Sequence, residues 1–332
     1  MKARFQALAE KVRRGEPLPP VCAAVLEAAT PAVRVGMWLR RLRPRVFVDA
    51  RVISFGNLTA GGTGKTPAVI ERARAESAAG KKVAVLTRGY GSDHARRPVV
   101  VDSDTPNAYA LVGDEAALIA RKVAGARIVK CADRVAGART AMAEFGCDTL
   151  LLDDGYQYVR LARNENVLLV DATNPFGNGH LIPRGILREP PAAARRATRI
   201  ILTRCDQADD LPNLMATLLM AAPQAPVRKT RHAPTALWRV ADGETVALDT
   251  IRGRQVKAVC AIASPEAFYK TLEDIGAAVA ERVAFTDHAE IAPEALAFEG
   301  PVVVTEKDAV RMDRTRTADN VLALAVELRD CE

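Results

Sequence analysis

A glycine-rich run between an apolar segment and a helical segment carries the strongest chemical signal in the sequence. It extends from Gly56 to Thr66 as Gly-Asn-Leu-Thr-Ala-Gly-Gly-Thr-Gly-Lys-Thr. Backbone N–H groups of such a loop close around phosphate oxygens, and the N-terminus of the next helix adds a favourable dipole. The run therefore predicts a nucleoside triphosphate site, in which Lys65 reaches the β- and γ-phosphates and the Thr66 hydroxyl holds Mg²⁺. The residues expected to contact the nucleotide are Thr59, Ala60, Gly61, Gly62, Thr63, Gly64, Lys65 and Thr66.

Two carboxylates complete the expected phosphate site. Asp153 and Asp154 directly follow the apolar strand predicted at 149–152. In phosphate-loop proteins a carboxylate at the end of such a strand joins the shell of the metal ion, because the strand lies beside the loop. Many parallel strands end in aspartate, so this signal gains its weight from the glycine-rich run before it. Together the two patterns indicate ATP and Mg²⁺ as cofactors.

Further polar clusters lie where strands are expected to end, which is where α/β proteins place functional groups. Arg88 follows the strand predicted at 83–87 with Gly-Tyr-Gly after it, and Arg134 follows the strand at 127–131. Asp114 and Glu115 open a predicted helix, where carboxylates either act in catalysis or only cap the helix. His288 follows a later strand, and an ordinary surface histidine is the commoner explanation for it. A long irregular loop at 176–190 is of the kind that is functional or disordered.

The composition narrows the class of protein. The chain has 332 residues, 49% apolar and 26% charged, with a net charge of +7. A basic balance attracts polyanions such as anionic lipid or phosphorylated substrates, although arginine can also just supply a solvated surface. Aromatic residues make up only 5%, which argues against stacking platforms for nucleic acid. Six singly spaced cysteines predict reduced thiols, and the absence of paired metal-ligand spacings argues against structural zinc.

Apolar strands that alternate with helices from residue 51 onward predict an α/β protein. The expected fold is a P-loop NTPase-like, mostly parallel sheet with helices on both faces, plus a smaller C-terminal α/β domain. A Pro-containing stretch near 223–236 marks the expected boundary, and a hairpin is predicted around Asp242-Gly243. The predicted units are 1–50, an N-terminal amphipathic and basic helical segment; 51–222, the P-loop domain; and 223–332, the smaller domain.

The N-terminal segment offers two interpretations. Two short helices are predicted, one before Pro31 and one at about 33–42 with Trp38 and several arginines around it. A basic amphipathic helix with tryptophan can lie in a membrane interface, or its apolar face can pack on the neighbouring domain. No signal peptide is expected because the first twenty residues are charged. No spanning helix is expected either, since the stretch 21–39 contains Glu27, Pro31 and Arg34.

Taken together, the motifs resemble the tetraacyldisaccharide 4′-kinase family, the lipid A 4′-kinases of Gram-negative bacteria. The resemblance runs in family order from about residue 20 to 312. Its pieces are Gly56–Pro67, Arg88–Gly91, Gly113–Glu115, Asp153–Gly155 with Gln157, Phe176–Gly179, Pro183 with Leu187–Pro190, Ser264–Phe268, Asp287–His288 and Thr305–Asp308. Tyr158 and Ala289 depart from it, because the family often has histidine at both positions.

The resemblance implies a reaction and roles for residues. Family members transfer the ATP γ-phosphate to the 4′-hydroxyl of an acylated glucosamine disaccharide phosphate, at the cytoplasmic face of the bacterial inner membrane. By motif, Asp114 resembles the catalytic base, His288 its partner, and Asp153 and Asp154 the Mg²⁺-associated carboxylates. The positions expected to bind the acceptor are Arg88, Arg134, Gln157, Asn178, Arg188 and Glu189. A peripheral protein on an anionic membrane surface is expected, with no nucleic acid and no obligate protein partner.

Two rival functions use the same glycine-rich run. A partitioning-type ATPase switch has a similar loop, but a lysine that acts across its dimer stands where this chain has Ala60. A nucleic-acid-binding ATPase would suit the basic charge, yet no helix-turn-helix, RNA-binding aromatic pair or zinc finger supports it.

Overall fold

A single mixed sheet extends through the molecule. The computed structural model describes residues 11–12, 16–89 and 97–331, apart from the side chains of Arg40 and Arg41. The strand order is β11-β10-β12-β13-β8-β7-β6-β1-β5-β2-β4-β3, and β9 pairs with β8 beside this path. The strands are β1 (Arg51–Asn57), β2 (Val83–Thr87), β3 (Val99–Val101), β4 (Arg127–Lys130), β5 (Thr149–Leu152), β6 (Glu165–Asp171), β7 (Arg199–Thr203), β8 (Val227–Arg239), β9 (Thr245–Val246), β10 (Gln255–Cys260), β11 (Ala278–Ala284), β12 (Val302–Thr305) and β13 (Val321–Asp330). The helices are α2 (Pro20–Arg41), α3 (Lys65–Ala78), α4 (Ala108–Val112), α5 (Asp114–Lys122), α6 (Arg134–Phe145), α7 (Leu211–Ala221), α8 (Pro265–Asp274) and α9 (Glu306–Ala309).

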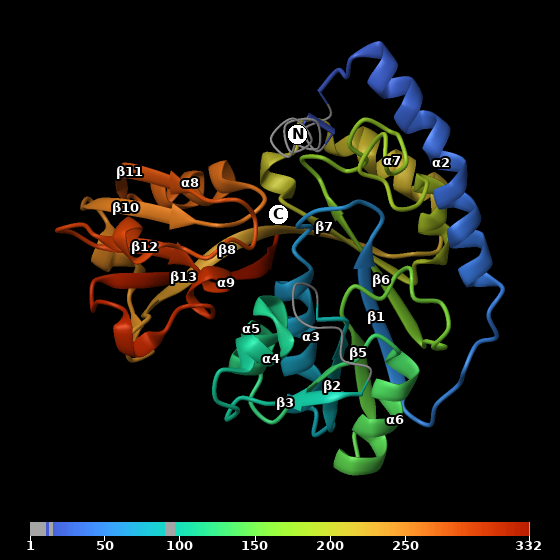
Figure 1. Cartoon of the computed structure of the whole chain (residues 1–332), viewed down its shortest axis with the longest axis horizontal. Coiled ribbons are helices and arrows are strands. Elements are labelled where there is room, and N and C mark those ends of the chain that lie inside the picture. The colour runs from blue at the N-terminus through green and yellow to red at the C-terminus, as the bar shows by residue number, and fades with distance from the viewer. Residues whose placement is uncertain (1–10, 13–15, 90–96, 332) are drawn as a thin grey trace.

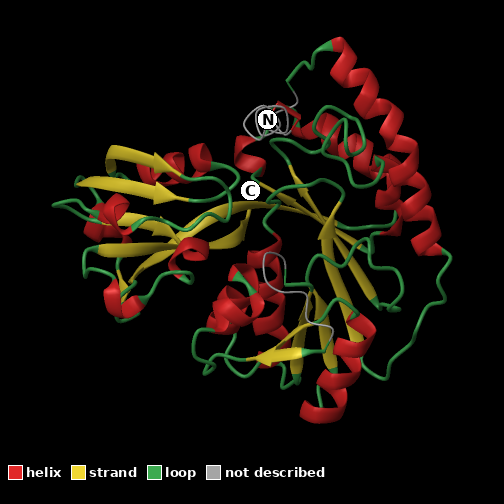
Figure 2. Ribbon diagram, in the orientation of Figure 1, coloured by secondary structure: helices red, strands yellow, loops and turns green. Residues whose placement is uncertain are grey.

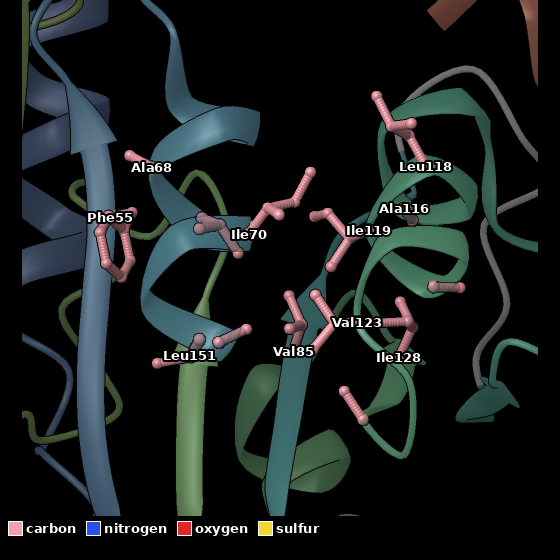
Figure 3. Packing of buried hydrophobic residues seen from close by; sticks show 14 of the residues in the cluster. Phe55, Ala68, Ile70, Val85, Ala116, Leu118, Ile119, Val123, Ile128 and Leu151 are labelled. Carbon is pink, nitrogen blue, oxygen red and sulfur yellow. The ribbon is translucent and has the colours of Figure 1, made fainter. Parts of the chain in front are cut away.

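Strands β1 to β7 and their helices form the phosphate-loop half, in which the central strands are parallel and covered on both faces (Figure 2). Successive side chains of a strand point to opposite faces. Accordingly Ile53 and Phe55 pack with α3 and α5, whereas Val52 packs with α6. Figure 3 shows Phe55 and Leu151 on their strands beside α3, which carries Ala68 and Ile70, while Ile119 of α5 lies next to Val85. The alternation explains why the strands are apolar on both sides.

Strands β9 to β13 with α8 and α9 form the C-terminal half, at the left of Figure 1. Strand β8 joins the two halves. Its start pairs in parallel with β7 at Ile200–Val227, and its later part pairs antiparallel with β13. The predicted P-loop NTPase-like α/β class is confirmed. The exact domain limits stay a prediction, because β8 belongs to both pairings.

Most predicted elements agree with the structure, and the predicted hairpin is present as the antiparallel pair of β8 with β9. The strands predicted at 83–87 and 149–152 have the predicted bounds, and the strand predicted at 127–131 ends one residue earlier, at Lys130. The sequence analysis did not identify β3, α4, α7 or β13, and it underestimated the length of β8. Each of the six cysteines lies in the described part of the chain and is unpaired, in agreement with the predicted thiols.

The N-terminal segment differs from its prediction in two ways. One continuous helix, α2, contains Pro31 inside it, so the predicted pair of short helices was wrong. Residues Pro20–Leu39 are also long and apolar enough to cross a membrane by length and composition, with 6% of the residues buried, so the prediction that no helix meets that standard was wrong. Val21 and Trp38 are exposed, which leaves much of the apolar surface of α2 without protein cover.

Candidate active site

The glycine-rich run forms a loop between β1 and α3, at the edge of a cleft of about 1430 Å³ that both halves line. Thr59 stands where phosphate loops usually have their first glycine. It pairs with Leu187 in an antiparallel bridge, an extended conformation that does not require glycine. Gly64 has φ +76°, and a Cβ there would lie 2.8 Å from His232 Nε2. Glycine is therefore needed at residue 64 both for its backbone conformation and for close packing. Gly61, with φ +128°, supplies the second left-handed turn.

Lys65 begins α3 and points back over the loop. Its Nζ donates to Asn57 Oδ1 at 3.3 Å and lies 3.7 Å from Asp154 Oδ1. Thr66, the next residue, is buried. Lys65 and Thr66 both line the cleft, and their contacts to phosphate and metal stay a prediction.

The two aspartates after β5 have different surroundings. Asp154, at φ +50°, receives hydrogen bonds from Arg188 Nη1 at 2.9 and 2.7 Å to its two oxygens. Burial opposes its ionisation, but the charges of Lys65 and Arg188 outweigh burial and lower the pKa of Asp154. Asp153 is fully buried, and its Oδ1 has no hydrogen-bond partner among the described residues. Burial, then the charges of Glu115 and Asp154, raises the pKa of Asp153 to about 7.

The unpartnered oxygen of Asp153 tests whether Mg²⁺ fits this site. A buried carboxylate oxygen without a partner carries a free-energy cost that a bound cation removes. Mg²⁺ is usually held by one or two carboxylates together with substrate phosphates and water. No group of three or more His, Cys, Asp or Glu residues in the described part of the chain could hold a metal by itself. Asp153 and Thr66 therefore fit a cation whose remaining ligands come from the nucleotide and water.

Asp114 and His288 meet across the cleft. Asp114 is the first residue of α5, and its Oδ2 lies 2.8 Å from His288 Nδ1. The other carboxylate oxygen accepts a hydrogen bond from the backbone N–H of Glu115 at 2.8 Å. Arg311 Nε, from the C-terminal half, lies 3.9 Å from the same Oδ2. The contact exists in this conformation, so further closure of the two halves is not needed to form it.

The electrostatics of the pair favour a charged state. Burial raises the pKa of Asp114, but the hydrogen bond and charge of His288 and the charge of Lys307 outweigh burial, so its pKa is lowered. The hydrogen bond to Asp114 in turn raises the pKa of His288 against the effect of burial. Both shifts favour an ionised Asp114 paired with a charged His288 in the cleft lining.

The other predicted acceptor-binding residues divide into two groups. Arg88, Arg134, Gln157, Arg188 and Glu189 line the cleft. Asn178 lies apart, since its amide donates to the Arg184 carbonyl and its side-chain oxygen accepts from the His180 N–H. Residues 90 and 91 of the predicted Arg88–Gly91 motif lie outside the described residues.

Arg134 and Glu189 show how cleft groups are held. The Arg134 guanidinium lies over the Tyr158 ring at 5.4 Å, and its buried Nε has no hydrogen-bond partner among the described residues. The Tyr158 hydroxyl donates to Asp133 at 2.7 Å, which ties the loops after β4 and β5 together. The tyrosine that departs from the family pattern thus has a positioning contact. Glu189 is paired with Arg196 at 2.7 and 2.8 Å, which suits a supporting role better than a direct contact with the acceptor.

The structure adds Lys307, a cleft residue to which the sequence analysis gave no role. Lys307 pairs with Glu115, so a cation from the C-terminal half meets a carboxylate of the phosphate-loop half. The signals were present as the motifs at 305–308 and 113–115, but their contact spans 192 residues of chain.

The comparisons with known proteins cover nearly the whole chain. The sequence model of the family Tetraacyldisaccharide-1-P 4′-kinase matches residues 20–330. A tetraacyldisaccharide 4′-kinase of Anaeromyxobacter dehalogenans (strain 2CP-C) is 44% identical over 302 residues, which are 86% of this chain and 78% of that protein. That of Syntrophus aciditrophicus (strain SB) is 36% identical over 334 residues, which are 92% and 89% of the two chains. A crystal structure of LpxK from Aquifex aeolicus in complex with ATP has a TM-score of 0.73 at 26% identity, covering 93% of this chain and 92% of that one.

Proposed function

Since the chain belongs to the tetraacyldisaccharide 4′-kinase family, we propose that the cleft between its halves transfers the ATP γ-phosphate to the 4′-hydroxyl of a tetraacyldisaccharide 1-phosphate. The protein is an ATP-dependent lipid kinase of lipid A biosynthesis. The observation that carries the assignment of the cleft is that Lys65, Asp153 and the Asp114–His288 pair all line it. The partitioning-type ATPase is not favoured, because the family match extends through both halves.

At the nucleotide end, the loop N–H groups and the start of α3 bind the phosphates, and the Lys65 ammonium neutralises charge on the β- and γ-phosphates. Asp153 and Thr66 would hold Mg²⁺, which would supply charge neutralisation between the phosphates when bound. Arg188 keeps Asp154 oriented and neutralised, so this second carboxylate need not bind the cation.

At the acceptor end, the Asp114 carboxylate accepts the proton of the 4′-hydroxyl as its oxygen attacks the γ-phosphorus. His288 holds Asp114 in place through Nδ1 and keeps the carboxylate ionised until it takes the proton. Arg88 and Arg134, which also line the cleft, provide positive charge that suits a phosphorylated disaccharide.

The first expected result is a direct phosphate transfer. With γ-labelled ATP, the purified protein should label a tetraacyldisaccharide 1-phosphate but not the same lipid with its 4′-hydroxyl blocked. Chelation of Mg²⁺ should stop the transfer and added Mg²⁺ should restore it. Asp153→Asn should need more Mg²⁺ for half-maximal rate, whereas Asp148→Asn, at an exposed position just before β5, should not. Labelling of the blocked lipid would refute the 4′-hydroxyl as acceptor, and an unchanged Mg²⁺ requirement in Asp153→Asn would refute the cation site.

We also propose that α2 attaches the enzyme to the cytoplasmic face of an anionic inner membrane. The exposed apolar side chains on α2 suit the acyl region, and the arginines that follow suit lipid phosphates. Leu26, Val33 and Met37 of the same helix line the cleft, which offers an apolar path for acyl chains. ATP is a cytoplasmic substrate, so the cleft must open to that side.

Deleting residues 1–45 should reduce co-sedimentation with anionic vesicles several-fold, because it removes α2 and ends before the bridge of Val46 with Leu161. Deleting only residues 1–19 keeps α2 and should preserve binding. Salt should weaken binding of the intact chain, since the Debye length falls from about 10 Å at 0.1 M to about 3 Å at 1 M. Equal sedimentation of the long deletion and the intact chain would contradict the membrane role of α2.

A further inference from the structure

The mechanism above gives no role to Lys307, a lysine of the C-terminal half that lines the cleft. It follows β12 in α9, within the 305–308 motif, and its ammonium forms an ion pair with Glu115 Oε1 across the cleft. Both side chains lie deep in the protein yet keep part of their surface open to the cleft, 29% for Lys307 and 31% for Glu115. The pair is therefore accessible to a substrate that enters the cleft.

Lys307 and Lys65 both line the cleft, one from each half of the molecule. Glu115 interacts electrostatically with both lysines, and so does Asp153. Lys65 is the residue that meets the β- and γ-phosphates in phosphate-loop proteins. Lys307 lines the same cleft and is paired with Glu115, the residue after Asp114, so its ammonium borders the space in which the γ-phosphate and the acceptor hydroxyl must meet.

A purely structural role is already filled by another ion pair between the halves. Lys122 Nζ, at the end of α5, lies 2.5 Å from Glu306 Oε1, which also accepts from Trp238 Nε1 at 3.0 Å. Glu306 borders the cleft but is almost fully buried, and Lys122 is outside the described cleft lining. A second ion pair between α5 and α9 that only joined the two halves would not need a lysine in the cleft lining. Lys307 lies in that lining.

We propose, on the basis of the kinase function above, that Lys307 is a further catalytic residue that binds the transferring phosphoryl group. As the 4′-oxygen bonds to the γ-phosphorus, the bond from that phosphorus to the β–γ bridging oxygen breaks and ADP leaves. The hydroxyl proton goes to Asp114. The Lys307 ammonium keeps its protons and donates from Nζ to a non-bridging phosphoryl oxygen. Glu115 holds the Lys307 ammonium in place before ATP binds. The ammonium is then already positioned when a phosphoryl oxygen enters the cleft.

The test compares Lys307→Met with Glu115→Gln, with the double variant and with Lys122→Met. The measurements are kcat at saturating ATP and acceptor, the KM for ATP, and the midpoint of thermal unfolding. Lys307→Met should lower kcat about 100-fold with little change in KM, because the lost contact is strongest in the transition state. Lys122→Met removes the matched ammonium at the other end of α5 and should lower the unfolding midpoint while keeping kcat.

The double variant distinguishes a contact with the phosphoryl group from a role in neutralising Glu115. It also leaves no unpaired Glu115 carboxylate, so it serves as the test if Lys307→Met alone folds poorly. We expect its kcat to stay about 100-fold below that of Glu115→Gln. Recovery of the double variant to the level of Glu115→Gln would overturn the proposal, since Lys307 would then only neutralise Glu115. A near-normal kcat in Lys307→Met would overturn it as well. An inactive wild-type enzyme would instead contradict the kinase function.

Discussion

Lys65→Ala is expected to lower kcat about 10³-fold, since removing one preorganised donor from a charged transition state costs up to this much. The Lys65 ammonium lies between Asn57 and Asp154, at the start of α3. Arginine is not an adequate replacement, because its planar fork differs in shape and reach from the compact ammonium. The rate is measured with labelled ATP and saturating acceptor.

The control for this substitution is Lys81→Ala, an exposed lysine in the connection between α3 and β2. It has the same change in charge and side-chain size but lies outside the cleft, so its kcat should match the wild type. Asp154 keeps its two hydrogen bonds from Arg188 in Lys65→Ala, so the thermal unfolding midpoint should change little. Near-normal turnover in folded Lys65→Ala would exclude this loop as the ATP site.

The phosphate loop and its strands were predictable because their signals are local. Residues Gly56 to Thr66 combine a strand, a turn and a helix start within a short run, and each step has its own residue preference. The parallel strands are apolar on both faces, as the packing of Ile53 and Val52 in different clusters shows. Such strands are detectable without knowing their neighbours.

Strand β8 could not be predicted at its full length because its own residues do not specify a strand. It carries four Lys or Arg residues at 228–239 together with Pro234, which usually weakens a strand. It is held by its neighbours, β7 on one side and β13 on the other. The proline falls at the irregularity in the pairing with β13, where a missing N–H is tolerated. Tertiary pairing thus overrides local preference in the segment that joins the two halves.

The sequence motifs named individual residues of the candidate site but not the contacts between them. Motif resemblance selected Asp114 and His288, yet only the structure places their side chains at 2.8 Å across 174 residues of chain. The same holds for Glu115 and Lys307, whose motifs were visible but whose pairing depends on how α5 meets α9. Asn178 shows the opposite case, because a polar residue in a matching motif can be used entirely within its own loop.

Asp114→Ala is expected to lower kcat about 10³-fold with a modest change in the KM for ATP, since it removes the proton acceptor but no phosphate contact. His288→Ala should lower kcat less, about 10²-fold, as expected for a group that assists proton transfer. The double variant should be little worse than Asp114→Ala alone, because His288 acts through Asp114. The control is His180→Ala, which replaces a partly exposed histidine outside the cleft and should keep normal activity.

The pH behaviour of His288 checks the same coupling without turnover. Since the hydrogen bond to Asp114 raises the pKa of His288, the imidazolium should persist above the ordinary value of 6.5. In Asp114→Asn the imidazole, followed by NMR, should titrate at a lower pH than in the wild type. The pair's contribution to stability from this shift is present below pH 6.5 and is lost as the pH rises through the raised pKa. Multiplicative kinetic losses, together with an unshifted His288 titration, would mean that the two residues act independently and that the contact across the cleft is incidental to proton transfer.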